Sequence, residues 1–249
     1  MDWHNRYQTQ AAWTQTLRKH LVDTRVSLSP QSKVLEIGCG TGVITKWFHE
    51  QYNSQLFGLD FNYSSIILAT RNNRIISYYV SDAQDVPFAP CIFDLVFCHY
   101  FLLWLSTPIL ALRECMRTLK PGGKFIAFAE PDYLARIDYP PSLERLGALQ
   151  TRSLIKQGVN PSAGRQLVGW LNQCGFTDIA IGIIGHEDAP AGIPGWLESE
   201  HEVIQNDLGR ELPAAEFNSL LDEDTAAWKN GSRLLFVPTF YAVATKPDD

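Results

Sequence analysis

The segment between Lys33 and Glu50, KVLEIGCGTGVITKWFHE, constrains this chain more than any other part of it. An apolar stretch of strand type ends in a turn that holds Gly38, Gly40 and Gly42, and a helical pattern follows directly. Glycine lets the backbone approach a ligand where a side chain would collide, and the first turn of a helix leaves N–H groups unpaired. The segment therefore predicts a strand, a ligand-binding turn and a helix in succession.

An acidic residue, Glu36, stands at the end of the expected strand and bears on the charge of the ligand. The glycine spacing is G-x-G-x-G, whereas the dinucleotide fingerprint is G-x-G-x-x-G and places a pyrophosphate on the helix N-terminus. A carboxylate here would repel a pyrophosphate and attract a positively charged group, such as an ammonium or a sulfonium. Without a ligand, the same residues would form a tight strand-to-helix turn and nothing more.

Strand and helix patterns alternate through the first half of the chain. The expected strands cover residues 33–37, 55–59, 77–80, 93–98 and 124–130, and the expected helices begin at residues 43 and 63 and cover 108–119. This alternation predicts an α/β fold with a doubly wound, mostly parallel sheet and helices on both faces. The stretches around Leu95 and Phe125 are apolar almost throughout, as expected for strands covered on both sides.

Four segments follow one another in an informative order. They are LEIGCGTG, LFGLD ending at Asp60, SDAQDVPF with Asp82 and Ala83, and FDLVFCHYFLLWL followed by LKPGGKFIAFAEP. Together they resemble the class I S-adenosylmethionine-dependent methyltransferases over residues 33–131. The resemblance implies a Rossmann-like sheet of seven strands with an antiparallel last strand, S-adenosyl-L-methionine as the cofactor, and methyl transfer as the activity.

The resemblance also implies roles for single residues. Asp60 would chelate the ribose hydroxyls, and Asp82 with Ala83 would recognise the adenine. The aromatic faces of Tyr7 and Trp13 would attract the sulfonium by cation–π interaction. The complete set of expected cofactor-binding residues is Glu36, Gly38, Cys39, Gly40, Gly42, Asp60, Phe61, Asp82, Ala83, Cys98, Tyr7 and Trp13. Alternatives stay open, because Asp60 also suits a helix N-cap and Asp85 could replace Asp82.

Further aromatic residues, Tyr100, Trp104 and Tyr133, are candidate walls of the pocket. Plain core packing explains Trp13 and Trp104 equally well.

Two titratable residues stand where an acceptor would meet the methyl group. His99 follows the fourth strand and Glu130 ends the fifth, so each is a candidate general base, and Glu130 is also a candidate for orienting the acceptor. The alternatives are a hydrogen-bonded structural histidine and a turn acid before Pro131. CHYF follows the fourth strand in place of an Asn-Pro-Pro-aromatic motif, which counts against methylation of nucleic-acid amino groups.

The chain is expected to form a single domain over residues 1–249. Its expected parts are an N-terminal helical cap at 1–32 with one helix at 8–22, a cofactor-binding core at 33–131, and an acceptor-side insertion at 132–175 ending in a helix from Asn160 to Gly175. Residues 176–249 should hold final strands at 177–184 and 233–245, with acidic helices near 195–208 and 213–229 between them. Pro238 predicts a bulge or break in the last strand, because proline removes a hydrogen bond from the sheet.

A run of cationic residues gives the insertion a positive bias: Arg136, Arg145, Arg152, Lys156 and Arg165. Such a run usually forms a solvated helix face, and a site for a carboxylate or phosphate of the acceptor is the alternative.

Composition bounds the partners. The formal net charge of −6 counts against a nucleic-acid binder. Five cysteines without a C-x-x-C pair suggest neither a disulfide framework nor a metal site, and no apolar stretch approaches the ~18 residues of a membrane span. We therefore expect a cytoplasmic protein that acts on a small molecule, and the sequence leaves its oligomeric state open.

Two other functions share part of this pattern. A nicotinamide-dependent oxidoreductase has a similar turn and ribose acid, but the glycine spacing and Glu36 oppose it. A non-catalytic cofactor-binding module would keep the cofactor residues and lack a usable acceptor pocket. The preferred interpretation is in-line transfer of a methyl group to oxygen, nitrogen or carbon of a small molecule, in which the protein mainly aligns the acceptor and excludes water.

Overall fold

The structure of the protein is a computed structural model that describes residues 3–184, 193–208 and 212–248. Its centre is a seven-stranded sheet with the strand order β3-β2-β1-β4-β5-β9-β7. The strands are β1 (Lys33–Ile37), β2 (Gln55–Asp60), β3 (Ser77–Val80), β4 (Phe93–Cys98), β5 (Leu119–Pro131), β7 (Thr177–Ile184) and β9 (Thr239–Thr245). Strand β9 runs antiparallel to both of its neighbours, β5 and β7, and the pairs from β3 to β5 are parallel. The predicted α/β sheet with an antiparallel last strand is confirmed.

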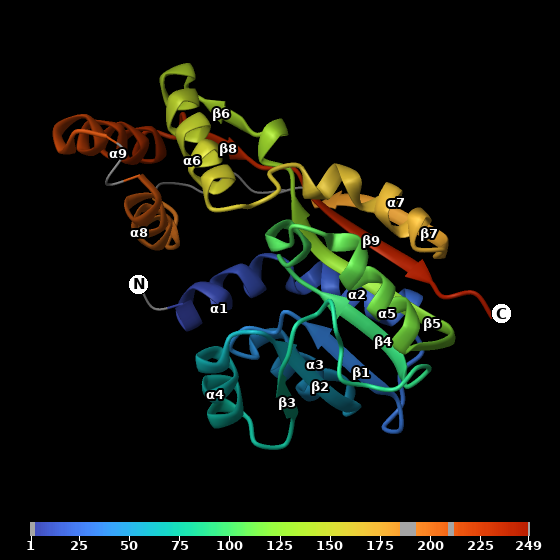
Figure 1. Cartoon of the computed structure of the whole chain (residues 1–249). Helices are drawn as coiled ribbons and strands as arrows, with labels where there is room; N and C mark the ends of the chain where they lie inside the picture. Colours follow the sequence, from blue (N-terminus) through green and yellow to red (C-terminus); the bar gives the residue numbers. More distant parts are fainter. Residues whose placement is uncertain (1–2, 185–192, 209–211, 249) are drawn as a thin grey trace.

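Helices cover both faces of this sheet (Figure 1). The helices are α1 (Trp3–Trp13), α2 (Gln15–Arg25), α3 (Val43–Tyr52), α4 (Tyr63–Asn72), α5 (Pro108–Thr118), α6 (Glu144–Lys156), α7 (Ala163–Gln173), α8 (Leu197–Leu208) and α9 (Ala214–Lys229). Three short 3₁₀ helices are η1 (Leu102–Trp104), η2 (Tyr133–Ala135) and η3 (Pro141–Leu143). Helices α1, α2 and α3 pack on one face, and α5 and α7 pack on the other.

The central strands are buried on both sides, because successive side chains of a strand point to opposite faces. Val34 belongs to the core under α2 and α3, and the next residue, Leu35, belongs to the core under α5 and α7. Phe48 of α3 stacks on Phe97 of β4 with ring centroids 4.4 Å apart. The two cores hold the carboxyl ends of β2, β1 and β4 side by side, where ligands bind in open α/β sheets.

The N-terminal region differs from its prediction. The expected single helix at 8–22 is wrong: two helices, α1 and α2, meet at Thr14, whose backbone is not helical. The hydroxyl of Thr14 accepts a hydrogen bond from Arg18, and Arg18 also donates to the carbonyl of Ala11 at 2.6 Å. These bonds hold a bend that a helical apolar pattern does not reveal.

Strand β5 is longer than its predicted range of 124–130. Leu119 pairs with Phe93, whereas the next pair joins Lys124 to Leu95, so the intervening residues bulge out of the ladder. Gly122, with φ of +70°, lies in this bulge. Gly122 and Gly123 therefore lie in an irregular stretch within one strand.

A small cap layer stands beside the sheet (Figure 1). It consists of α6, α8, α9 and a two-stranded sheet of β6 (Ile137–Tyr139) and β8 (Leu234–Phe236), which the sequence analysis missed. The layer has its own apolar cluster, with Leu146 of α6, Ile204 of α8 and Phe217 of α9. Each strand of the small sheet spans three residues, too few for a recognisable alternation.

The predicted break at Pro238 is confirmed, since β8 ends at Phe236 and β9 begins at Thr239. The carbonyl of Pro238 accepts a hydrogen bond from the N–H of Asp132 at 2.8 Å. The break lets one segment of the chain pair first with the cap layer and then with the central sheet. The helix expected from Asn160 begins slightly later, at Ala163, and packs on β5, β7 and β9.

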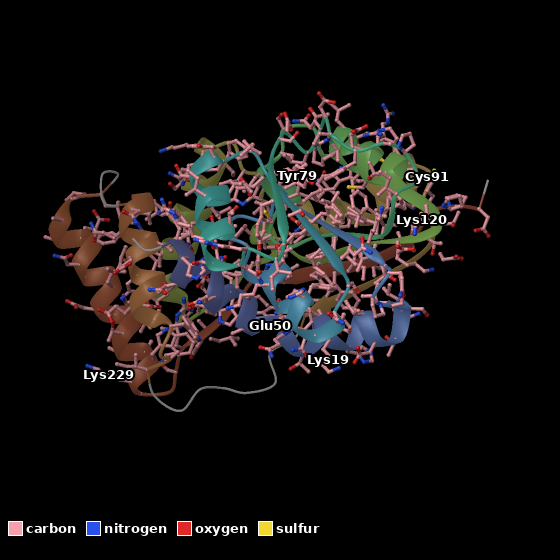
Figure 2. All side chains as sticks on the ribbon, turned by 90° about the horizontal axis from the view of Figure 1, so that it is seen from below. Lys19, Glu50, Tyr79, Cys91, Lys120 and Lys229 are labelled. Carbon is pink, nitrogen blue, oxygen red and sulfur yellow. The ribbon has the colours of Figure 1, made fainter. Side chains whose placement is uncertain are left out.

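Figure 2 gives the second view of this arrangement. Helices α8 and α9, with Lys229, stand at one side, and Cys91 and Lys120, which lie at the amino ends of β4 and β5, stand at the other. The cap layer is therefore on the side of the carboxyl ends of the strands. Among the described residues, no helix combines the length and the apolar character needed to cross a bilayer.

Candidate functional site

The turn between β1 and α3 has the backbone of a close-approach loop. Gly38, Gly40 and Gly42 all have positive φ, and Gly42 is the left-handed N-cap of α3. At Gly40, with φ of +51°, a Cβ atom would lie 3.0 Å from the ring of Tyr7. A larger residue here is opposed both by backbone strain and by the aromatic ring.

Aromatic rings cover the whole turn. A Cβ atom on Gly38 would collide with the ring of Phe101, and one on Gly42 would collide with the hydroxyl of Tyr78. Phe101 precedes η1 and Tyr78 comes from β3, so elements far apart in the sequence meet here. The turn is thus a backbone surface enclosed by aromatic side chains, of which the sequence analysis named only Tyr7.

Asp60 joins the ends of β1 and β2. Its Oδ2 accepts a hydrogen bond from the N–H of Gly40 at 2.8 Å, and its Oδ1 accepts one from the N–H of Asn62 at 2.8 Å. The side chain of Asn62 caps α4 by accepting from Ser65, so the alternative of Asp60 as that cap does not apply. The carboxylate is partly exposed and therefore fixes the turn while keeping a face toward solvent.

The remaining expected cofactor residues lie around the same strand ends. Asp82 is exposed and accepts the N–H of Gln84 at 2.9 Å, whereas Ala83 is buried. Phe61 is 78% exposed, so it presents a free aromatic face directly after Asp60. Cys39 and Cys98 are both buried thiols.

The side chain of Glu36 is buried and not exposed to solvent. Only 2% of it is exposed, and its Oε2 accepts a hydrogen bond from the hydroxyl of Thr45 in α3. Burial raises the pKa of Glu36 to about 8, although the bond from Thr45 and the charge of Arg18 oppose that rise. The residue is therefore not the freely exposed carboxylate that the strand-end position suggested.

Arg18 links the N-terminal helices to this turn, and the sequence analysis missed it. It is 1% exposed, and its guanidinium lies over the ring of Trp47 at 4.7 Å from the centroid. Burial lowers the pKa of Arg18 to about 10, and the nearby Glu36 limits that fall, so the side chain stays charged at neutral pH. The sequence does not distinguish it from Lys19, its exposed neighbour on α2.

His99 is tied to the bend between α1 and α2. Its Nε2 lies 2.8 Å from the hydroxyl of Thr14, whose oxygen already accepts a bond from Arg18. The hydroxyl of Thr14 also lies 3.4 Å from the carbonyl of Ala11, so its proton can go to that oxygen or to Nε2, and the direction of the bond to His99 depends on the tautomer of the ring. Burial and the charge of Arg18 hold the pKa of His99 well below its usual value. In either tautomer Nε2 is hydrogen-bonded to Thr14.

Glu130 is completely buried at the end of β5. Its Oε1 accepts the N–H groups of Phe101 at 3.0 Å and Leu102 at 2.9 Å, and its Oε2 accepts that of Leu103 at 3.1 Å. Burial raises the pKa of Glu130 to about 7, although these three donors favour the ionised form. The carboxylate satisfies the N-terminus of η1 and so fixes Phe101 against Gly38.

A polar cluster lies beside helix α1, and its members are Arg6, Tyr100, Tyr133, Gln150 and Glu200. Arg6 donates to Glu200 at 2.7 Å, and the amide of Gln150 donates to the same carboxylate at 3.4 Å. The charges of Arg6 and Glu200 act on both tyrosines, and burial raises the pKa of Tyr100 to about 12. Both tyrosines keep some accessible surface, and the hydroxyl of Tyr100 also forms a hydrogen bond with Thr239.

The expected aromatic walls divide between two places. Tyr7 lies on the glycine turn, and Tyr100 and Tyr133 lie in the polar cluster. Trp13 lies under the guanidinium of Arg6 at 5.2 Å and meets Trp196 edge-on, so it lies next to the cluster. Trp104 is 53% exposed.

The cationic run of the insertion is largely paired with acids. Arg136 pairs with Asp138 at 2.6 Å, Arg145 with Glu216, and Arg165 with Asp132. These pairs join the elements of the cap layer or tie α7 to the end of β5.

A hollow of about 620 Å³ opens between α1, α6 and α8, away from the glycine turn. Its lining includes Trp3, Ser153 and Val203. Each of these residues stands three positions from a member of the polar cluster on the same helix, so the hollow lies about one helical turn from that cluster.

Within the described part of the chain, no group of three or more His, Cys, Asp or Glu residues could hold a metal ion.

The sequence is similar to a known domain family and to several known proteins. Residues 35–127 match the family described as "Methyltransferase domain". The chain is 31% identical over 151 residues to an uncharacterized methyltransferase of Schizosaccharomyces pombe, covering 55% of this chain and 54% of that protein. It is 29% identical over 184 residues to the demethylmenaquinone methyltransferase of Renibacterium salmoninarum, covering 67% and 75%. For the first of these relatives, the match spans about half of the relative's length.

Among solved structures, phosphoethanolamine N-methyltransferase 2 of Haemonchus contortus superposes with a TM-score of 0.60 at 16% identity. The match covers 96% of this chain and 57% of that chain, whose structure holds phosphomonomethylethanolamine and S-adenosylhomocysteine. At this identity the likeness establishes the fold, in agreement with the strand order of the central sheet.

Proposed function

The chain belongs to the class I S-adenosylmethionine-dependent methyltransferases, and on that premise we propose that it transfers the methyl group of S-adenosylmethionine to a small-molecule acceptor. The observation that carries this proposal is the hydrogen bond from Gly40 to Asp60. It joins the glycine turn to an acid at the end of the neighbouring strand, at the sheet edge where open α/β folds bind ligands.

The residues around the turn fit this cofactor. Asp60 would hold the ribose hydroxyls with its partly exposed carboxylate, and Asp82 with Ala83 would receive the adenine beside Phe61. The glycine backbone would approach the methionine portion, next to Cys39 and Cys98, with Glu36 and Arg18 behind the turn. Tyr7 would move or stack to cover it, and Trp13 would support the cap at Arg6.

The cofactor supplies an already activated methyl group, so the chain's own work is to bind, align and exclude water. Helix α1 is suited to closing the site, because Tyr7 covers Gly40 and the ring nitrogen Nδ1 of His4 lies 2.8 Å from the hydroxyl of Thr41. We propose that His99 and Glu130 act as positioning residues. His99 would hold the bend at Thr14, and Glu130 would hold η1.

Two acceptors come from the names of related proteins: demethylmenaquinone and phosphoethanolamine. Both are reasonable first members of an acceptor screen. They differ in charge, so a response to one of them already bears on the chemistry of the acceptor site.

Calorimetry with S-adenosylhomocysteine and NADH, each titrated into the full chain, tests the proposal. We expect micromolar binding of S-adenosylhomocysteine, loss of that binding in Asp60→Ala, and no change in a control, Asp23→Ala, on the exposed surface of α2. An acceptor screen with radiolabelled methyl donor then tests turnover. Binding of NADH without S-adenosylhomocysteine would refute the cofactor, and binding without turnover of any acceptor would leave a cofactor-binding module.

A further inference from the structure

Arg6 of the polar cluster uses only part of its hydrogen-bonding capacity within the described residues. It is 7% exposed, and its Nη2 donates to Glu200 at 2.7 Å. Its Nη1 is buried and, within the described part of the chain, has no hydrogen-bond partner. A buried guanidinium N–H without a partner costs free energy, so this group calls for an acceptor atom from outside the chain.

The guanidinium is held in a fixed place. The ring of Trp13 lies 5.2 Å from its central carbon, and Glu200 holds the other nitrogen. Gln150 is held in turn, since its oxygen accepts a bond from Arg136 and its amide nitrogen donates to Glu200. The side-chain amide of Gln150 is therefore already hydrogen-bonded, and the unpartnered Nη1 group of Arg6 is preorganised to bind a ligand.

Two further donors lie near Arg6. The hydroxyls of Tyr100 and Tyr133 stay protonated at neutral pH, because burial raises the pKa of both groups. Both residues keep accessible surface, and the charges of Arg6 and Glu200 act on both, while the hydroxyl of Tyr100 also forms a hydrogen bond with Thr239. A ligand that takes all three donors must carry several acceptor oxygens on one small group.

The charges around the cluster are balanced without a ligand. Arg136 and Arg233 share Asp138, and Arg233 also pairs with Asp224. With Arg6 and Glu200, three arginines face three carboxylates. Recognition would therefore come from directed hydrogen bonds, which are about twice as strong when the acceptor oxygen is ionised.

A hollow on the surface lies about one helical turn from the cluster. The hollow of about 620 Å³ lies between the same three helices, with Trp3 on α1, Ser153 on α6 and Val203 on α8. Trp3 precedes Arg6, Ser153 follows Gln150 and Val203 follows Glu200. Each separation is about one helical turn.

We propose that Arg6, Tyr100 and Tyr133 form a subsite for an acidic group, a carboxylate or a phosphate, carried by the methyl acceptor. The subsite rests on the proposed function, since Arg6 is the neighbour in α1 of Tyr7, which covers Gly40 of the cofactor turn. Three members of the cationic run of the insertion, Arg136, Arg145 and Arg165, are already paired with acids.

Saturation-transfer NMR on the full chain, with and without S-adenosylhomocysteine, tests the subsite. The probes are benzoate, phenyl phosphate, benzamide and benzyl alcohol, so that each acid has a neutral counterpart. We expect at least one acid to bind about tenfold or more tightly than its counterpart, which corresponds to about 1.4 kcal/mol. The two acid arms show whether the subsite prefers a carboxylate or a phosphate.

Three variants locate the effect. Arg6→Lys keeps a charge for Glu200 but loses the second nitrogen, and Tyr133→Phe removes only a hydroxyl, so both should reduce the acid preference while the protein stays folded. Arg145→Gln, an exposed arginine of α6, is the matched control and should leave the preference unchanged. Affinity for S-adenosylhomocysteine should stay within about threefold in all three, since none of these side chains lies at Asp60.

The inference is overturned if no acid binds at millimolar concentration, if the neutral probes bind equally well, or if the preference survives Arg6→Lys unchanged. Its failure can be told apart from failure of the proposed function. Cofactor binding and turnover of neutral acceptors alone would keep the methyltransferase and refute the subsite, whereas acid binding without any cofactor binding would refute the methyltransferase.

Discussion

Replacing Glu130 by glutamine should separate a structural carboxylate from a catalytic one. The wild-type carboxylate is fully buried and accepts three backbone N–H groups, two at Oε1 and one at Oε2. A glutamine keeps one carbonyl oxygen for Phe101 and Leu102, but its NH₂ group faces the N–H of Leu103. The N–H of Leu103 then loses its acceptor, and two bonds lose their charge assistance.

The magnitude follows from these bonds. An unpaired buried donor costs about 1–3 kcal/mol, and the loss of charge assistance at two bonds adds about 1–2 kcal/mol. We therefore expect Glu130→Gln to lower the free energy of unfolding by about 2–5 kcal/mol. At about 2–4 °C per kcal/mol for a chain of this size, Tm should fall by roughly 4–20 °C.

The pH dependence has a definite sign. The pKa of Glu130 is raised from 4.5 to about 7, so the folded chain binds this proton more tightly than the unfolded chain does. This group's contribution to the free energy of unfolding is therefore present below about 4.5 and is lost as the pH rises to about 7. Glu130→Gln should lack that component of the pH profile.

Denaturant unfolding at several pH values, with calorimetry of S-adenosylhomocysteine and a methyl-transfer assay, checks these expectations. We expect reduced stability and at most a modest loss of cofactor affinity, transmitted by Phe101 on Gly38. The reasoning is refuted if Glu130→Gln is as stable as the wild type and binds the cofactor normally while kcat collapses. In that case Glu130 is the base that its place after the fifth strand suggested.

The other predictions concern the cofactor turn and the closing helix. Asp60→Asn should weaken S-adenosylhomocysteine binding about 10- to 100-fold by calorimetry, because a charge-assisted pair to the ribose is lost, and unchanged affinity would exclude that role. Gly40→Val should abolish cofactor binding and cost about 1–2 kcal/mol of stability, because the backbone here is left-handed. Gly169→Ala, in open space on α7, should do neither. Complete unfolding of the valine variant would show that Gly40 has a packing role instead. Thr14→Val should remove the hydrogen bond to His99 and raise hydrogen exchange in α1. In the wild type, S-adenosylhomocysteine should protect α1 from exchange. If α1 is equally protected without ligand, the mobile cap is contradicted.

Much of the central fold is legible from local patterns. Strands β1, β3, β4 and β7 have the predicted bounds, and the break at Pro238 occurs because proline cannot donate to a sheet. The positive φ values of the glycine turn also follow locally, since only glycine adopts them without strain. These features depend on neighbouring residues and on the spacing of apolar residues, both of which can be read from the sequence.

The positions of the polar side chains depend on the tertiary structure. Arg6 and Glu200 pair although 194 positions separate them, and Glu130 meets the N–H groups of η1 only because β5 lies beside β4. Arg18 and Lys19 look alike in a helical pattern, yet one is buried and the other exposed. The sequence by itself determined where the backbone could form strands, a glycine turn and helices. Only the tertiary structure decided which charges are paired, buried or left with a free donor, because a polar group's partner comes from whichever distant segment packs against it.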